Sequence, residues 1–473
     1  MLNLALVIVV TRALDKNAAG AVFAVTSVFL LVETVVRLGT DAGVVHFVAK
    51  SQVAERSAVA QVIAASFVPL LPAMIIGGVV VGFLTPVVVH SLGPDAGISH
   101  VDLVSLVLAF MVPIAATYDF MTAATRGLGA NKPTVVIERI MRPLLQGAAV
   151  TALAVTTDSA AAVSIAWIAP YAVGFVLMFG SLRRRLRANG HHLRLADWRI
   201  RFREVWSWTL PRSITGMLQI LLQRLDIIIV GAILGAPAAA IYTGATRFVV
   251  VGQLGNQAIS YVFQPQLAGL VGAGKLKEAR ELYRVSTAWI VGLNAPLYLA
   301  VCTTSPLLVK LLGSRYHAGL GTMVIITAFS LVGTCCGLVD FVIITMGRTS
   351  WNLINTTIAL AVNLAIDLIF IPDHGIKAAA FGWGAAILIN NFLPLAQVNR
   401  AFQFNPVSRV WVVMLVVSGV LFGALPGVTL ATVGASLPAM VGVLAVATAV
   451  YLAVLWRLRE SLALSQLLPG GRK

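Results

Sequence analysis

Apolar runs of about 20 residues recur along the whole chain, separated by short polar connections. A helix rising ~1.5 Å per residue needs about this length to cross ~30 Å of hydrocarbon. Because every backbone polar group must be bonded in lipid, runs of this length indicate helices. We therefore predict an all-α, polytopic membrane protein with about 14 transmembrane helices. The predicted spans are 1–13, 18–38, 58–82, 102–124, 134–156, 160–181, 205–235, 238–263, 285–309, 319–345, 351–371, 376–398, 410–429 and 437–456.

Composition narrows the class of protein further. Of the 473 residues, 59% are apolar and 11% are charged, against about 25% charged in soluble domains. A chain this apolar is neither an ordinary soluble domain nor intrinsically disordered. The net charge of +16 would suit a nucleic-acid partner. The positions of the basic residues along the chain test this interpretation.

The basic residues lie mostly in the connections on one side of the membrane. Lys and Arg in short loops are retained on the cytoplasmic side. With the N-terminus inside, 23 basic residues fall in cytoplasmic connections and termini, and five fall in the opposite connections. The excess of 26 Arg over eight Lys indicates a GC-rich bacterial genome. We therefore expect a bacterial cytoplasmic (inner) membrane protein with both termini in the cytoplasm and no nucleic-acid partner.

Three segments recur in chain order at a nearly constant offset of 219 to 221 residues. The pairs are Ala21–Phe29 with Ala240–Phe248, Thr85–Gly93 with Ser305–Gly313, and Asp119–Phe120 with Asp340–Phe341. This spacing predicts a duplicated unit of six helices. Because six is even, both copies begin on the same side, and an axis along the membrane normal relates them, as in transporters that rock two bundles about a substrate.

The repeat predicts four parts of the chain. These are an N-terminal six-helix bundle at 1–181, a basic cytoplasmic linker at 182–204, a C-terminal six-helix bundle at 205–399, and two accessory helices with a cytoplasmic tail at 400–473. Set against its partner in the repeat, the first helix lacks about 15 residues. We expect this helix to be truncated, with the true start upstream of Met1 or with residues removed.

A set of loose hydrophobic motifs with fixed polar points carries a family resemblance. The motifs are Pro211–Gln219, Arg224–Gly231, Ile241–Tyr242, Gln264–Pro265, and Asn363–Pro372 followed by Gly375–Ile376. They resemble the polysaccharide-transporter branch of the multidrug/oligosaccharidyl-lipid/polysaccharide exporter superfamily, whose members are Wzx-type flippases. The resemblance implies that a polyprenyl-diphosphate-linked oligosaccharide or polysaccharide repeat unit moves from the inner to the outer leaflet by alternating access. It also implies membrane lipids, a polysaccharide polymerase and glycosyltransferases as partners.

Three other functions stay open at this stage. Two belong to the same superfamily: a cation-coupled multidrug exporter and a peptidoglycan-precursor lipid flippase. The third is a membrane-embedded glycosyltransferase or polymerase, which is disfavoured because the longest outer connection, at about 89–101, offers few carboxylates. The chain also lacks the Gly-Lys-Ser/Thr ending of a phosphate loop. We therefore expect that the protein is not an enzyme and has no cofactor. Coupling to protons or sodium ions is the expected energy source.

Six arginines lie inside the predicted spans, where a charge costs ~2.5 to 3.5 kcal/mol on insertion scales. They are Arg37, Arg139, Arg142, Arg212, Arg224 and Arg247. The planar guanidinium binds two phosphate oxygens at once, so the predicted substrate-binding residues are Arg224, Arg247, Arg212 and Arg142. Arg224 has no obvious partner because Asp226, two residues on, points away from it on a helix. Arg37 and Arg139 lie close enough to the inner surface to snorkel.

Acidic residues inside the spans are the candidates for coupling or gating. They are Asp226, Asp119, Asp340, Glu33 and Glu138, and Asp367 lies in a span as well. Burial disfavours the charged carboxylate, which brings its titration toward the working range of a proton gradient. The repeat makes Asp119 and Asp340 a symmetric pair, suited to capping or gating hydrogen bonds or to ion coupling.

Several of these acids have a predicted basic partner. Glu33 with Arg37, and Glu138 with Arg142, stand four residues apart and can pair along one helix face. Asp226 and Arg247 lie at about equal depth on antiparallel neighbours. They are predicted to form either a static salt bridge or an ion pair that opens on phosphate binding or protonation.

The linker between the repeats carries eight Arg from Arg183 to Arg203. We expect these residues to fix topology and to attract anionic lipid, at ~1 kcal/mol per basic residue, with recruitment of the diphosphate headgroup as an alternative. His191 and His192 are too sparse for a zinc site. We therefore expect no metal site.

Overall fold

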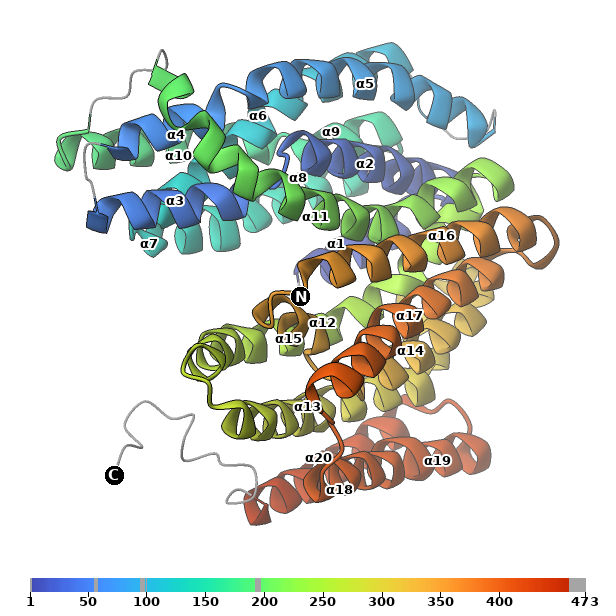
Figure 1. Ribbon diagram of the computed structural model, residues 1–473. Helices are drawn as coiled ribbons and strands as arrows, with labels where there is room; N and C mark the ends of the chain where they lie inside the picture. Colours follow the sequence, from blue (N-terminus) through green and yellow to red (C-terminus); the bar gives the residue numbers. More distant parts are fainter. Residues whose placement is uncertain (1, 55–57, 94–97, 99, 192–196, 459–473) are drawn as a thin grey trace. The chain divides into compact units, whose positions relative to one another are not determined.

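The computed structural model describes residues 2–54, 58–93, 98, 100–191 and 197–458 (Figure 1). Over these residues the chain is helical and contains no strand. Each of the 14 predicted spans is helical over most of its length. Eleven helices in this part of the chain are long and apolar enough to cross a membrane. The all-α, multi-pass class is therefore confirmed, whereas the count of 14 spans is not.

Contacts divide the chain into two compact units, residues 1–243 and 244–473. The helices of the first unit are α1 (Leu2–Ala13), α2 (Lys16–Val36), α3 (Thr40–Ala54), α4 (Ala58–Phe67), α5 (Leu70–Ser91), α6 (Val101–Gly127), α7 (Asn131–Pro133), the π-helix η1 (Thr134–Met141), α8 (Arg142–Thr156), α9 (Ala160–Ile168), α10 (Pro170–Ala188) and α11 (Trp198–Leu234). The boundary falls inside α12 (Ala236–Gly272). The repeat boundaries expected from the sequence stay a prediction.

Helix α2 forms the centre of the first unit. It is buried along most of its length and packs against α5, α9 and α11, while α3 packs against α4 and α6. Small residues make this possible: Ala18, Ala19, Ala21 and Ala24 are all at most 4% exposed. Because α11 packs against α2, α3 and α4, it completes this unit rather than lying outside it.

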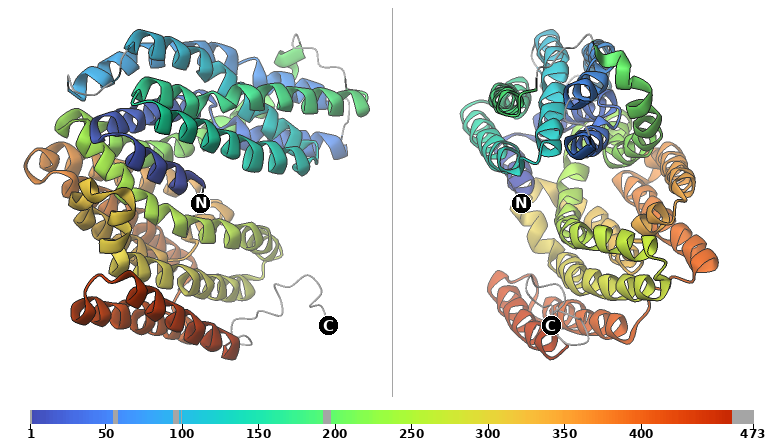
Figure 2. Two further views of the ribbon diagram at one scale, coloured as in Figure 1. Left: turned by 180° about the vertical axis from the view of Figure 1, so that it is seen from behind. Right: turned by 60° about the vertical axis from the view of Figure 1, so that its left-hand side comes forward.

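The second unit is built around α13 (Leu276–Leu312). The remaining elements are η3 (Ser314–Gly319), α14 (Leu320–Thr334), α15 (Val339–Thr345), α16 (Thr349–His374), α17 (Ile376–Phe402), α18 (Arg409–Ser418), η4 (Gly419–Ala424), α19 (Leu425–Val433) and α20 (Leu437–Arg457). Helix α13 packs against α14 and α18. The Tyr451 hydroxyl of α20 donates to the Gly292 carbonyl of α13 at 2.6 Å, so the last two predicted spans are fixed to this unit; its backbone is drawn from behind in Figure 2.

Large apolar side chains cover the outer faces of both units. Phe83 is 75% exposed, Phe110 is 66% exposed and Trp456 is 69% exposed. Contiguous apolar surface of this kind is rare on soluble monomers and marks contact with another apolar phase. The outer faces therefore suit lipid, in agreement with the apolar spans.

Candidate functional site

A break between α2 and α3 positions the main polar cluster of the first unit. Leu38 and Gly39 have φ values of 48° and 67°, which turns the chain between the two helices. A Cβ atom on Gly39 would lie 2.6 Å from the Cβ atom of Ser213 on α11, so only glycine fits this left-handed position. The break places Arg37 at the C-terminus of α2 and Asp41 in the first turn of α3. Each charge is favoured by the helix dipole at its own end.

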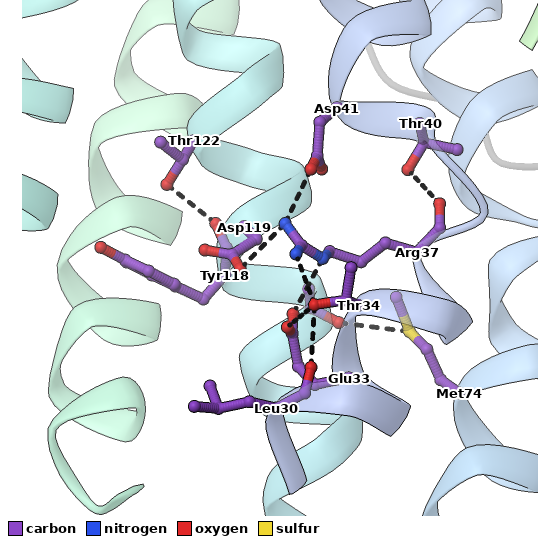
Figure 3. A network of polar contacts seen from close by, with 11 residues as sticks. Leu30, Glu33, Thr34, Arg37, Thr40, Asp41, Met74, Tyr118, Asp119 and Thr122 are labelled. Atoms are coloured by element: carbon purple, nitrogen blue, oxygen red, sulfur yellow. Dashed lines mark hydrogen bonds and ion pairs between the residues drawn. The ribbon is translucent and has the colours of Figure 1, made fainter. Parts of the chain in front are cut away.

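The Arg37 guanidinium contacts three carboxylates (Figure 3). Its Nε lies 3.0 Å from Glu33 Oε1. Its Nη1 donates to Asp41 Oδ2 at 2.7 Å and lies 3.2 Å from Asp119 Oδ2 on α6. We call these four residues the Arg37 cluster. Three elements thereby meet at one guanidinium, which ties α2 and α3 to α6.

The charges of the Arg37 cluster do not balance. The Glu33 side chain is 2% exposed, that of Arg37 is 17% exposed and that of Asp119 is 19% exposed. Three ionised carboxylates beside one guanidinium leave two excess negative charges, which is costly where they are poorly solvated, as at Glu33 and Asp119. The Asp41 side chain is 38% exposed. Arg126 and Arg142 lie within electrostatic range of the cluster. The arrangement is chemically suited to taking up and releasing a proton or a small cation.

The cluster confirms one predicted pair, corrects one expectation and contains two contacts that were not predicted. Glu33 and Arg37 pair as predicted. Arg37 does not snorkel to the surface, because three carboxylates hold its guanidinium within the unit. Asp41 was not predicted, since it lies beyond the apolar run that ends at residue 38, although its spacing of four residues from Arg37 is a signal in the sequence. The contact of Asp119 with Arg37 joins positions 82 residues apart, which no local pattern reveals.

Glu138 and Arg142, predicted to pair, lie within electrostatic range of each other. They form no direct ion pair in the described structure, and Glu138 Oε2 and Arg142 Nε are buried without hydrogen-bond partners. Residues 134–141 form a π-helix, in which the bonds run from i to i+5. The pairing stays a prediction.

Arg142 instead lies against an aromatic ring. Its Cζ atom is 4.6 Å from the ring centroid of Tyr171 on α10, a cation–π contact. Tyr171 packs edge-on against Tyr118 at 5.8 Å between ring centroids. Arg224, half-buried on α11, lies within electrostatic range of the same tyrosine, and in the described part of the chain no acidic residue pairs with it. Two predicted substrate residues thus share Tyr171, which the sequence analysis missed because nothing in its local pattern marks it.

The remaining predicted site residues either lie elsewhere in the fold or have side chains outside the described residues. Asp226 is buried on α11 and its Oδ2 accepts a hydrogen bond from the Tyr242 hydroxyl at 2.8 Å. Arg247 belongs to the second unit, so its pairing with Asp226 stays a prediction. Arg212 lies in α11, but its side chain is outside the described residues. Asp340, in the first turn of α15, is half-buried and makes no ion pair with a described residue, unlike Asp119.

The described residues include His, Cys, Asp and Glu, the side chains that most often bind metal ions. No group of three or more His, Cys, Asp or Glu among them is placed to hold a metal ion. The three cysteines are free thiols in the second unit.

Comparison with known proteins identifies the family. The sequence pattern of a family described as polysaccharide biosynthesis protein matches residues 9–319. The chain belongs to this family. No curated protein sequence matches the chain.

Solved structures with the same fold are flippases and transporters by their titles. The lipid II flippase MurJ in an inward closed conformation superposes with a TM-score of 0.71 at 13% identity, covering 96% of this chain and 97% of that one. An inward-facing multidrug resistance MATE family transporter of the MOP superfamily gives 0.64 at 14% identity, covering 85% and 95%. A Vibrio cholerae MATE transporter, VcmN, gives 0.57 at 16% identity, covering 87% and 94%. The family match agrees with the resemblance predicted from the sequence motifs, and the chain shares the fold of these solved structures.

Proposed function

We propose that the protein flips a polyprenyl-diphosphate-linked oligosaccharide or polysaccharide repeat unit from the inner to the outer leaflet of the cytoplasmic membrane. The observation that carries the proposal is the pair of guanidinium groups, Arg142 and Arg224, gathered about Tyr171. Neither forms an ion pair with a described acidic residue. A charged side chain inside a membrane unit is costly and by default marks a functional site. A diphosphate is the part of this substrate that needs such charge to cross hydrocarbon.

The geometry supports a division of roles in substrate binding. Arg142 and Arg224 bind diphosphate oxygens through their planar forks, and the Tyr171 ring holds the Arg142 guanidinium in place. Arg212 and Arg247 are proposed as further contacts for the phosphates or sugars.

Energy coupling is assigned to the Arg37 cluster. Protonation or cation binding at Glu33 or Asp119 would loosen the hold of these carboxylates on Arg37, and with it the tie between α2 and α6. Glu138, Asp226 and Asp340 are proposed as secondary coupling or gating residues. The coupling ion is a proton or sodium.

A second candidate is a flippase for a peptidoglycan-precursor lipid. The MurJ structure favours it, since the likeness extends over 96% of this chain. Both candidates place a diphosphate-linked glycan at the same arginines, so the site alone does not separate them. Complementation does: growth of a strain depleted of its peptidoglycan-precursor flippase would be restored only in the second case.

We also propose an orientation of the chain in the membrane and the proteins that act before and after it. Both termini lie in the cytoplasm, and the substrate is supplied by glycosyltransferases and passed to a polysaccharide polymerase on the far side. These partners follow from the family and from the chemistry of a lipid-linked glycan.

The test compares single substitutions in proteoliposomes loaded with a lipid-linked oligosaccharide. Arg142→Gln and Arg224→Gln should each lower the flipping rate at least tenfold, because one charge-assisted contact to phosphate contributes ~1.5 to 3 kcal/mol. Arg139→Gln is the matched control, since this neighbouring arginine is exposed and should leave the rate within twofold. Wild-type flipping by a properly inserted Arg142→Gln/Arg224→Gln protein would refute the assignment.

A further inference from the structure

A cavity of about 520 Å³ lies in the first unit on the side of α6 that faces α4 and α10. Its walls are almost wholly apolar, with an aromatic contribution from each of the three helices. Phe67 and Phe120 contact each other with ring centroids 5.0 Å apart, and Phe175 stacks on Phe179 at 6.3 Å. The lining residues are Ile63, Phe67, Thr117, Phe120, Met121, Phe175, Phe179, Leu182, Arg183, Leu186, Arg187 and His191. We call this cavity the α4/α6/α10 groove.

One end of the groove is basic. Arg183 and Arg187 stand one turn apart on the last turns of α10, both exposed, and His191 follows the helix. Residues four apart share a helix face, so these arginines continue the face that carries Phe175 and Phe179. Arg184 and Arg185 belong to the same run of charge but do not line the groove. The lining contains no acidic residue.

The combination selects a particular kind of occupant. Between a membrane protein and bulk lipid the hydrophobic effect gives no net attraction, because lipid tails are as apolar as the groove. The apolar wall therefore sets only the shape that fits, and selectivity has to come from charge. Basic pockets between transmembrane helices bind anionic lipid headgroups. A free phosphate would leave the apolar wall unused, and an uncharged lipid would leave the arginines unused.

We propose that the α4/α6/α10 groove binds one anionic phospholipid, with its acyl chains along the aromatic wall and its phosphate at Arg183 and Arg187. Tyr171 is not among the lining residues, although it lies one turn before Phe175 on the same face of α10. Helix α6 contributes to both the groove and the Arg37 cluster. Phe120 and Met121 line the groove, and the preceding residue, Asp119, contacts Arg37. The bound lipid packs against α6 and restrains the helix that carries this carboxylate.

Native mass spectrometry of the full chain in mild detergent tests the proposal. The probes are phosphatidylglycerol and phosphatidylcholine with identical acyl chains. The wild-type protein should retain phosphatidylglycerol in preference. Arg183→Gln/Arg187→Gln should reduce that retention about 30-fold, from the electrostatic contribution expected of two basic residues near a headgroup. Arg184→Gln/Arg185→Gln removes the same charge from the same helix and should retain the preference.

Three outcomes would overturn the proposal. Equal retention of the two lipids by the wild-type protein would show that the charge of the headgroup does not determine binding. Equal loss in both double variants would show a general effect of net charge. Stronger arginine-dependent retention of undecaprenyl phosphate than of phosphatidylglycerol would assign the groove to the substrate carrier. Because Arg183 and Arg187 are exposed, both variants should keep the wild-type helical circular dichroism, which confirms that folded proteins are compared.

Discussion

Arg37 links α2, α3 and α6 through ion pairs rather than through apolar packing. Glu33, Asp41 and Asp119 approach one guanidinium from three elements. An unbalanced group of this kind is stable only while the cation remains, because each carboxylate would otherwise be poorly solvated and unpaired. The pairing of Glu33 could be predicted from its spacing, whereas Asp119 could not, since its approach depends on the packing of α6 beside α2 and α3.

Removal of the cation should therefore cost more than removal of one anion. Arg37→Ala should lower the free energy of unfolding by about 3 to 5 kcal/mol, the range for breaking a buried pair by deleting one partner. Glu33→Gln should cost less, because two carboxylates still balance the guanidinium. Thermal unfolding in detergent measures both. Equal destabilisation by the two substitutions would contradict the account of excess negative charge.

At the scale of the element, the sequence predicts where the helices lie but not where they are interrupted. Apolar runs of about 20 residues locate the helices, because the thickness of the bilayer dictates the length of a membrane-spanning helix. The π-helix at residues 134–141 leaves no mark in hydrophobic spacing, since its extra residue per turn is absorbed within one apolar segment. The contact of Arg142 with Tyr171 could not be predicted either, because the two residues are 29 positions apart on different helices. The break after α2 carries a clearer signal, a glycine two residues after the intramembrane Arg37.

Gly39→Ala should destabilise the joint between α2 and α3. The left-handed backbone costs an alanine ~1 to 2 kcal/mol, and the new Cβ would lie 2.8 Å from the Ser213 Cα, so backbone atoms must move. Gly190→Ala is a matched control, because Gly190 has φ 71° with nothing within 4 Å of an added Cβ. The loss of thermal stability should be clearly larger for Gly39→Ala. Equal losses would show that contact with α11 is unimportant.

At the scale of the whole molecule, the number of spans predicted from hydropathy exceeds the number of long apolar helices in the described structure. The segment Leu4–Ala13 is apolar but too short to count as a span, and residues 134–156 contain Glu138, Arg139 and Arg142 within an interrupted helix. For these two segments the difference lies in length and polarity. The third segment, 238–263, is helical within α12 but is not among the eleven helices.

Cysteine labelling of intact cells tests the sidedness. In a background with Cys302, Cys335 and Cys336 replaced by Ala, Ala435→Cys should react with a membrane-impermeant maleimide. Asn189→Cys, beside the arginine-rich linker, should react only after the membrane is opened. The reverse pattern would overturn the predicted orientation, and labelling of both sites in intact cells would show that the intervening spans are miscounted.

The π-helix before Arg142 has a geometric consequence for the whole segment that precedes it. An α-helix turns by about 100° per residue, so every side chain before the π turn is out of phase with α8 by roughly one residue. Conversion of residues 134–141 to α-helical bonding would rotate that segment about its axis. The side chains that precede the π-helix would then point in a different direction relative to Arg142, which contacts the Tyr171 ring.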